Sequence, residues 1–270
     1  MNRNIIFSLI AIALLSLLSS CNNEAHMNTE LSFKKIKYND QIHLFGNDNY
    51  PAFDMDLKLS LPEDSLAFEG LYHAMLKTYF DSLYRADVSA DKEMYVLADL
   101  LTKIYRELEE DLQLDSMDIG SSFNWQIVKT NEVLFQNKHY LSFVNEEYSF
   151  TGGAHGNTIR DHYVFDLKKN LVLEADDFFD LTKCEELIQL QKQSLEKAGF
   201  EIDGFWEDGF RCDDNFYILD KGFVFHYDQY EIASYAAGPM DIFISFEEIK
   251  PFMLNPEILD LFLQDESNSK

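Results

Sequence analysis

Between Phe53 and Leu61, apolar and polar residues alternate without a break, and this segment constrains the fold more than any other part of the sequence. A period of two places every apolar side chain on one face, which is typical of a strand buried on one side and open to solvent on the other. Pro62 cannot donate a ladder hydrogen bond and is expected to end the strand. The apolar face then requires a covering layer.

Two segments with helical periodicity follow and can supply that layer. The first begins near Asp64 or Ser65, and the second begins near Asp91, a favourable N-cap residue. Each places its apolar residues on one stripe, which needs a sheet to cover. The first stripe comprises Phe68, Leu71, Tyr72, Met75, Tyr79 and Leu83, and the second comprises Met94, Leu97, Leu101, Ile104, Tyr105, Leu108 and Leu112.

The rest of the chain is dominated by short strands. The patterns predict strands at residues 123–127, 133–135, 140–150, 159–167, 216–219, 223–227 and 242–246, and helices at residues 184–198 and 256–262. Short connections between strands imply antiparallel hairpins. Because helices and strands are grouped rather than alternating singly, we predict an α+β fold, with antiparallel sheets packed against two to four helices in two closely associated halves.

The first twenty residues predict export from the cytoplasm. Arg3 lies in a short polar start, and an apolar run from Ile5 to Leu18 follows. A membrane-spanning helix needs about 20 apolar residues, whereas the core of a signal peptide needs about 7 to 15. The run ends in small residues before Cys21, an arrangement that resembles the cleavage box of bacterial lipoproteins.

Lipid attachment would determine where the protein resides. We expect residues 1–20 to be a lipoprotein signal peptide, Cys21 to carry acyl chains such as palmitate, and residues 21–30 to form a tether. More than one acyl chain gives stable anchoring to a membrane. The expected location is the cell envelope, on the periplasmic or surface-facing side of a bacterial membrane.

The chain is strongly acidic. It holds 48 Asp and Glu against 22 Lys and Arg, a formal net charge of −26. Such a surface repels nucleic acid and favours encounter with a cationic partner. The simpler alternative is that the charge only supports solubility. With 46% apolar residues, the chain is not a disordered acidic tail.

After lipidation of Cys21, the remaining cysteines would be Cys184 and Cys212. An oxidising envelope favours a disulfide between them. The sequence does not show that they meet, and Cys184, at the start of an amphipathic helix, could equally be a small core residue. Both interpretations stay open.

The segment from Tyr148 to Gly156 is the most unusual one in the chain. Its three glycines allow a backbone that turns with positive φ or approaches another surface closely. His155 lies among them and is expected to be exposed on a loop between two strands. It can be interpreted as a metal ligand, a general base or a contact residue; the structural alternative is a turn whose histidine caps a backbone group.

Signatures of catalysis and metal binding are missing from the sequence. There is no His-Glu-x-x-His pair, Gly-x-Ser-x-Gly elbow, phosphate loop or dinucleotide-binding fingerprint. Asp176 and Asp177 lie where a helix opens and suit N-terminal capping. The acidic loop with Asp208, Asp213 and Asp214 lacks the EF-hand spacing. We therefore predict no catalytic residue, no metal site and no cofactor.

Several motifs resemble one known pair of domains. Residues 148–155 read Tyr-x-x-x-Gly-Gly-Ala-His, residues 163–166 read Tyr-x-Phe-Asp, and residues 230–238 read Tyr-Glu-Ile-Ala-x-Tyr-Ala-x-Gly. They resemble the paired domains of unknown function found in RsiV-like lysozyme-sensing anti-sigma factors and beside the catalytic domain of PdaC-like peptidoglycan deacetylases. Asp177-Phe178-Phe179 stands where that family has Asp-Leu-Phe. The resemblance covers residues 33–262.

The resemblance implies a PdaC-like N-terminal α+β domain at residues 31–175 and an RsiV-like C-terminal domain at residues 176–264. The deacetylase relatives perform catalysis in a separate metal-binding domain, and the anti-sigma relatives have a transmembrane helix and a cytoplasmic sigma-binding segment. We expect none of these here. We therefore predict a non-enzymatic binding or sensing module for a cationic protein such as lysozyme, or for cell-wall glycan. The alternative is a peptidoglycan-directed hydrolase or deacetylase that uses His155.

The two motif segments are expected to form one recognition surface, because both hold glycines beside aromatic or histidine side chains that suit binding hot spots. The expected binding residues are Tyr148, Gly152, Gly153, His155, Tyr235 and Gly238. The surroundings of His155 separate the two functions. A pocket with a second titratable group within hydrogen-bond reach favours an enzyme, and an exposed ridge or flat loop favours binding.

Overall fold

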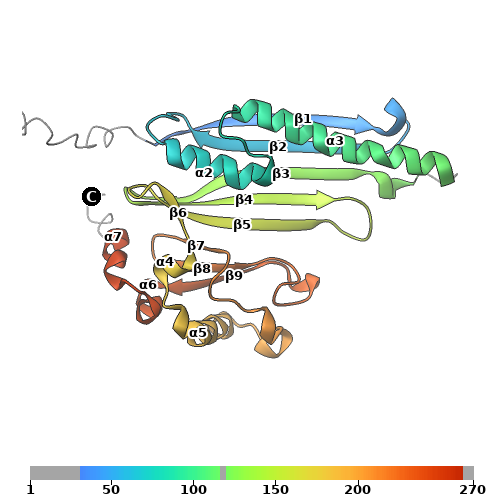
Figure 1. Cartoon of the computed structure of the whole chain (residues 1–270). Helices are drawn as coiled ribbons and strands as arrows, with labels where there is room; N and C mark the ends of the chain where they lie inside the picture. Colours follow the sequence, from blue (N-terminus) through green and yellow to red (C-terminus); the bar gives the residue numbers. More distant parts are fainter. Residues whose placement is uncertain (1–30, 116–119, 264–270) are drawn as a thin grey trace, which may run out of the picture.

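The computed structural model describes residues 31–115 and 120–263 (Figure 1). The predicted signal peptide, the predicted lipidation residue Cys21 and the predicted tether lie outside the described residues. The larger of two sheets has the strand order β1-β2-β3-β4-β5-β6. Its strands are β1 (Phe33–His43), β2 (Ala52–Pro62), β3 (Trp125–Gln136), β4 (Tyr140–Phe150), β5 (Asn157–Asp166) and β6 (Leu171–Leu173).

The predicted α+β class is confirmed, with one departure from an antiparallel sheet. Strands β2 and β3 pair in parallel, while the other neighbours in this sheet pair antiparallel. The chain between them passes through α2 (Glu69–Phe80), η2 (Asp81–Leu83) and α3 (Ala90–Asp115). This connection is a crossover and not a hairpin, and a crossover returns the chain in the same direction.

The strand predictions needed three corrections. The three-residue edge strand β6 was not predicted. The edge strand β1 was not predicted, because lysines and other polar residues occupy much of it and obscure its alternation. The short run at 133–135 is not a strand of its own. It continues β3 past a register shift between Val133 and Phe135.

Helices α2 and α3 cover one face of the large sheet and enclose the first hydrophobic core. Full burial of one large apolar side chain stabilises the fold by about 1.5–3 kcal/mol. The core includes Phe53, Met55, Leu57, Leu59 and Leu61 from β2, Leu71, Met75 and Tyr79 from α2, and Met94, Ala98, Tyr105 and Leu112 from α3. The alternating apolar residues between Phe53 and Leu61 are therefore buried under the two helices, as predicted.

One residue of the predicted helical stripe lies on the wrong side. Ile104 was expected to be buried, but 43% of it is exposed. It lies about a quarter turn away from the line of Ala98 and Tyr105 on the helix. The buried stripe of α3 is therefore narrower than the apolar pattern predicts.

The second sheet is antiparallel and contains β7 (Phe216–Ile218), β8 (Gly222–Tyr227) and β9 (Met240–Ser245). Around it lie α4 (Ala175–Phe178), α5 (Cys184–Lys197), α6 (Phe246–Ile249) and α7 (Asp260–Leu263). Short 3-10 helices complete the chain: η1 (Leu44–Gly46), η3 (Ser121–Phe123), η4 (Leu181–Lys183), η5 (Ile202–Gly204), η6 (Glu207–Gly209), η7 (Tyr235–Ala237), η8 (Lys250–Phe252) and η9 (Pro256–Leu259).

A cluster of phenylalanine rings forms the second core. It includes Phe178, Phe179, Phe216, Phe223 and Phe225, and Phe179 meets Phe223 edge-on with ring centroids 5.1 Å apart. Asp177 accepts a hydrogen bond from the backbone N–H of Glu174 in the capping box of α4, in agreement with its predicted capping role. Cys184 and Cys212 form a disulfide with a Cα–Cα distance of 5.5 Å, which ties the start of α5 to the loop before β7.

The two halves are joined where β4 and β5 face the second sheet (Figure 1). The buried Ser142 hydroxyl on β4 donates to the carbonyl oxygen of Ile218 and accepts from its N–H, at 2.9 and 3.1 Å. None of the helices in the described residues is long and apolar enough to cross a membrane.

Candidate functional site

The glycine-rich segment forms the turn between β4 and β5. Gly152 and Gly153 have φ values of +95° and +97°, which L side chains rarely adopt. A Cβ on Gly152 would lie 2.5 Å from the carbonyl oxygen of Ser122, and one on Gly156 would lie 2.5 Å from the Tyr148 ring. Gly153 faces open space. The close approaches expected of this segment are therefore made by Gly152 and Gly156.

His155 projects from this turn and stacks on Tyr235, with ring centroids 3.7 Å apart and an interplanar angle of 20°. The Tyr235 hydroxyl donates a hydrogen bond to the carbonyl oxygen of Gly156 at 3.0 Å. Tyr230 closes the group, because its hydroxyl lies 3.5 Å from His155 Nε2 although it is 75 residues away in sequence. We call His155, Tyr230 and Tyr235 the aromatic platform.

The platform joins the two predicted segments on the outside of the molecule. His155 and Tyr230 are exposed, and Tyr235 is half-buried beneath the histidine. Gly238, with φ +76°, ends η7 and follows Tyr235. Five of the six expected binding residues thus lie in the turn or beside the platform, and Tyr148 packs under the turn through Gly156.

The surroundings of His155 lack an acid-base partner. Its Nδ1 lies 3.0 Å from the Gly156 carbonyl oxygen, and its Nε2 faces the Tyr230 hydroxyl. Within residues 31–115 and 120–263, no carboxylate forms a hydrogen bond or ion pair with this ring. The geometry is that of an exposed contact surface and not of a paired acid-base site.

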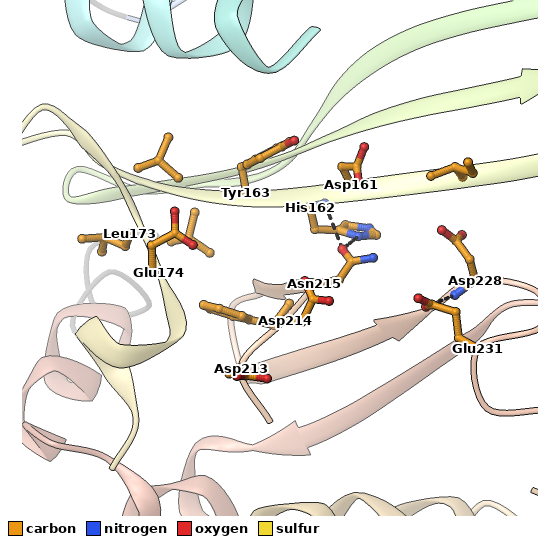
Figure 2. Close-up of a pocket in the computed structure, with 14 residues that line it drawn as sticks. Asp161, His162, Tyr163, Leu173, Glu174, Asp213, Asp214, Asn215, Asp228 and Glu231 are labelled. Carbon is orange, nitrogen blue, oxygen red and sulfur yellow. Dashed lines mark hydrogen bonds between the residues drawn. The ribbon is translucent and has the colours of Figure 1, made fainter. Parts of the chain in front are cut away.

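An acidic cleft of about 290 Å³ opens between the two halves. Figure 2 shows β5 on one side of it and the loop before β7 on the other. Its carboxylates are Asp161, Glu174, Asp213, Asp214, Asp228 and Glu231. Partial burial raises the pKa of Asp161, and the nearby Asp228 carboxylate raises it further. The turn that carries Tyr230 also supplies Asp228 and Glu231 to the cleft.

A histidine pair lies between the sheets behind this cleft. His226 is 2% exposed and contacts Asp241 through Nδ1 at 2.7 Å and Asp228 through Nε2 at 3.0 Å. Burial alone would lower the pKa of His226, but the hydrogen bonds to the two carboxylates outweigh it and raise the pKa to about 9. His226 is therefore a buried cation at neutral pH.

His162 has the opposite character. It stacks on Tyr217 with ring centroids 4.5 Å apart, and its ring centroid lies 4.7 Å from that of His226. Burial lowers the pKa of His162 to about 4, and the charge on His226 acts in the same direction. No group of three potential ligands that could hold a metal occurs in the described residues.

Side chains from the second half form hydrogen bonds with backbone groups on the free edge of β5. Asn215 accepts from the N–H of His162 at 3.0 Å and donates to the carbonyl oxygen of Arg160 at 2.7 Å. Asp228 accepts from the N–H of Arg160 at 3.1 Å. These side chains replace the backbone of a missing neighbouring strand. Sequence reasoning missed Asn215, Asp228 and His226, because no local pattern marks a side chain that caps a distant strand.

The acidic loop considered as a calcium site has a structural explanation. Arg211 forms ion pairs with Asp214 at 3.2 Å and with Glu231 at 2.6 Å. The guanidinium thus supplies the positive charge that a cation would have supplied. These pairs hold the loop that carries Asn215 against the turn that carries Tyr230.

Two sequence families match the chain, each over one of its halves. The family described as Deacetylase PdaC matches residues 37–158, and the family described as Protein of unknown function (DUF3298) matches residues 167–247. The chain is therefore similar to a PdaC region followed by a DUF3298 region. This confirms the predicted resemblance and indicates a module of extracytoplasmic type. No curated protein gave a match to this sequence.

Solved DUF3298 structures share the fold. A family member from Bacteroides fragilis superposes with a TM-score of 0.77 at 24% identity, over 87% of this chain and 98% of its own. A family protein from Pseudomonas aeruginosa gives a TM-score of 0.58 at 18% identity, over 85% of this chain and 97% of its own. The arrangement of the two regions is therefore that of the DUF3298 structures.

Proposed function

We propose that the chain is a binding module of the bacterial cell envelope, and that it recognises a cationic protein through the aromatic platform and the acidic cleft. The observation that carries this proposal is the platform itself. Two segments from different halves of the fold converge on three neighbouring rings, of which His155 and Tyr235 are stacked and His155 and Tyr230 are exposed. Within the described residues, none of the three rings forms a hydrogen bond or ion pair with a carboxylate. Such rings suit contacts with a partner rather than proton transfer.

The charges beside the platform favour a cationic partner. Six carboxylates line the cleft, and three of them, Asp161, Glu174 and Asp213, form no ion pair within the described residues. The faces of tyrosine rings attract Lys and Arg side chains within about 6 Å of the ring centroid. A net charge of −26 would draw such a partner by long-range attraction. The platform and the cleft together offer both parts of a site for basic side chains.

Export and anchoring belong to the same proposal. Lipid on Cys21 would hold the protein at a membrane, with residues 31–175 and 176–264 as a PdaC-like and an RsiV-like domain outside the cytoplasm. The platform would then face proteins that arrive from outside the cell.

Titration of the full chain in detergent with a lysozyme, used as a compact cationic protein, tests the proposal. Tyr235→Ala should weaken binding about tenfold, as expected for the loss of an aromatic hot spot. Added salt should weaken binding in the wild-type chain. Tyr50→Ala is the matched control, since Tyr50 packs on Phe45 in the β1–β2 connection with ring centroids 5.3 Å apart. Equal losses in both variants would contradict the proposed surface.

The PdaC family is described as a deacetylase, so the alternative function is enzymatic. Soluble peptidoglycan fragments should be bound or ignored, but not hydrolysed or deacetylated, by the purified chain. Turnover that His155→Ala abolishes would overturn the binding proposal and favour an envelope hydrolase or deacetylase that uses His155.

A further inference from the structure

Helix α3 carries a second apolar line that its own core does not use. Val96, Leu100 and Ile104 are 52%, 40% and 43% exposed. Residues four positions apart lie one above another on a helix, so the three side chains form a continuous ridge. Figure 1 shows α3 lying across β1 and β2 on the outside of the first half. We call Val96, Leu100 and Ile104 the α3 ridge.

The ridge is separate from the packing of the fold. The core side of α3 is already occupied by Met94, Ala98 and Tyr105, each at most 2% exposed. A helix on a sheet needs one apolar stripe, and scattered exposed apolar residues are common, but three on one line form a patch. The ridge therefore offers apolar surface to something outside the described chain.

A row of charged residues runs beside the ridge. Asp99, Lys103 and Glu107 follow the ridge residues at a constant offset of three positions, and Lys92 continues the line of the ridge before Val96. All four are exposed, and none forms an ion pair within the described residues. Their charges are available to a partner.

The charge order selects the orientation of a second copy. If two α3 helices met in parallel about a two-fold axis, opposite flanks of the two helices would meet, so the charged row of one copy would not contact the charged row of the other. In an antiparallel pair centred between Leu100 and Leu101, Asp99 lies about one residue from the level of Lys103 of the second copy. Glu107 then lies about two residues from the level of Lys92 of the second copy. The two-fold axis of this antiparallel pair also brings the same flank of both helices together, so each attraction occurs twice.

We propose that the α3 ridge is a self-association surface at which two copies of the chain pair through antiparallel α3 helices. The ridge supplies the apolar centre, and the charged row supplies the register. This proposal does not depend on the aromatic platform.

Sedimentation equilibrium of the full chain in detergent, over a range of protein concentrations, tests the pairing. The wild-type chain should form a reversible dimer. Leu100→Glu should weaken the dimer at least tenfold, because it places two carboxylates at the two-fold axis. Leu66→Glu is the matched control, since Leu66 is 86% exposed and lies outside the ridge. A wild-type chain that stays monomeric, or a dimer that Leu100→Glu does not weaken, would overturn the proposal.

A charge exchange tests the orientation. Lys103→Glu and Asp99→Lys should each weaken the dimer about fivefold, as expected for two reversed surface pairs. The double variant restores opposite charges across an antiparallel interface and should return the dissociation constant to within about twofold of wild type. Thermal unfolding followed by circular dichroism checks that each variant is folded. A double variant no tighter than the single variants would overturn the antiparallel pairing.

Discussion

The charge on His226 should make the stability of the protein depend on alkaline pH. This side chain is enclosed between the two sheets and contacts Asp228 and Asp241. Substitution by Gln keeps a hydrogen-bond donor of similar size but removes the charge. The two carboxylates then lose their cationic partner.

The structure sets the size and sign of the effect. The pKa of His226 is raised to about 9 from an ordinary value of 6.5, and each pKa unit corresponds to about 1.4 kcal/mol. A raised pKa in the folded state stabilises it fully below about pH 6.5, and this contribution is lost as the pH rises through 9. The whole contribution is about 3 kcal/mol, of which about 2 kcal/mol should disappear between pH 7 and pH 9.5.

Urea unfolding followed by tryptophan fluorescence at several pH values in this window measures the loss. The wild-type free energy of unfolding should fall with pH, whereas His226→Gln should be less stable at pH 7 and nearly independent of pH. His43→Gln, at the end of β1, serves as the control and should keep the wild-type slope. The reasoning is refuted if His226→Gln shows the same slope as the wild-type chain.

Three further perturbations have defined outcomes. Asn215→Ala should lower the free energy of unfolding by about 1–3 kcal/mol in a urea titration, because it leaves backbone groups on the edge of β5 without partners. Reduction of the Cys184–Cys212 bridge, or its replacement by two serines, should cost about 2–4 kcal/mol, since the bridge spans 28 residues; an unchanged melting temperature would contradict this. Cys21→Ala should leave the chain folded but release it from the membrane fraction, and sedimentation with membranes after a high-salt wash would argue for another anchor.

Local pattern was sufficient wherever one face of an element is buried against a single layer. The alternation from Phe53 to Leu61 predicted β2, and the apolar periodicity after Cys184 predicted α5. In both elements, burial of one face imposes a regular spacing of apolar residues, so the spacing in the sequence predicts the type of element. Strand β1 escaped prediction because its edge position leaves much of its sequence free to be polar.

The sequence by itself determined most of the strands and helices, though not the edge strands β1 and β6, and it determined the two segments that carry the family resemblance. It also raised the hypothesis that these segments form one surface. Only the tertiary structure placed His155 on Tyr235, since the contact joins two halves and depends on how β5 meets the second sheet. The same holds for Asn215 and His226, whose partners are backbone and carboxylate groups far away in sequence. Such contacts follow from the meeting of two sheets, and no residue's immediate neighbours in the chain encode them.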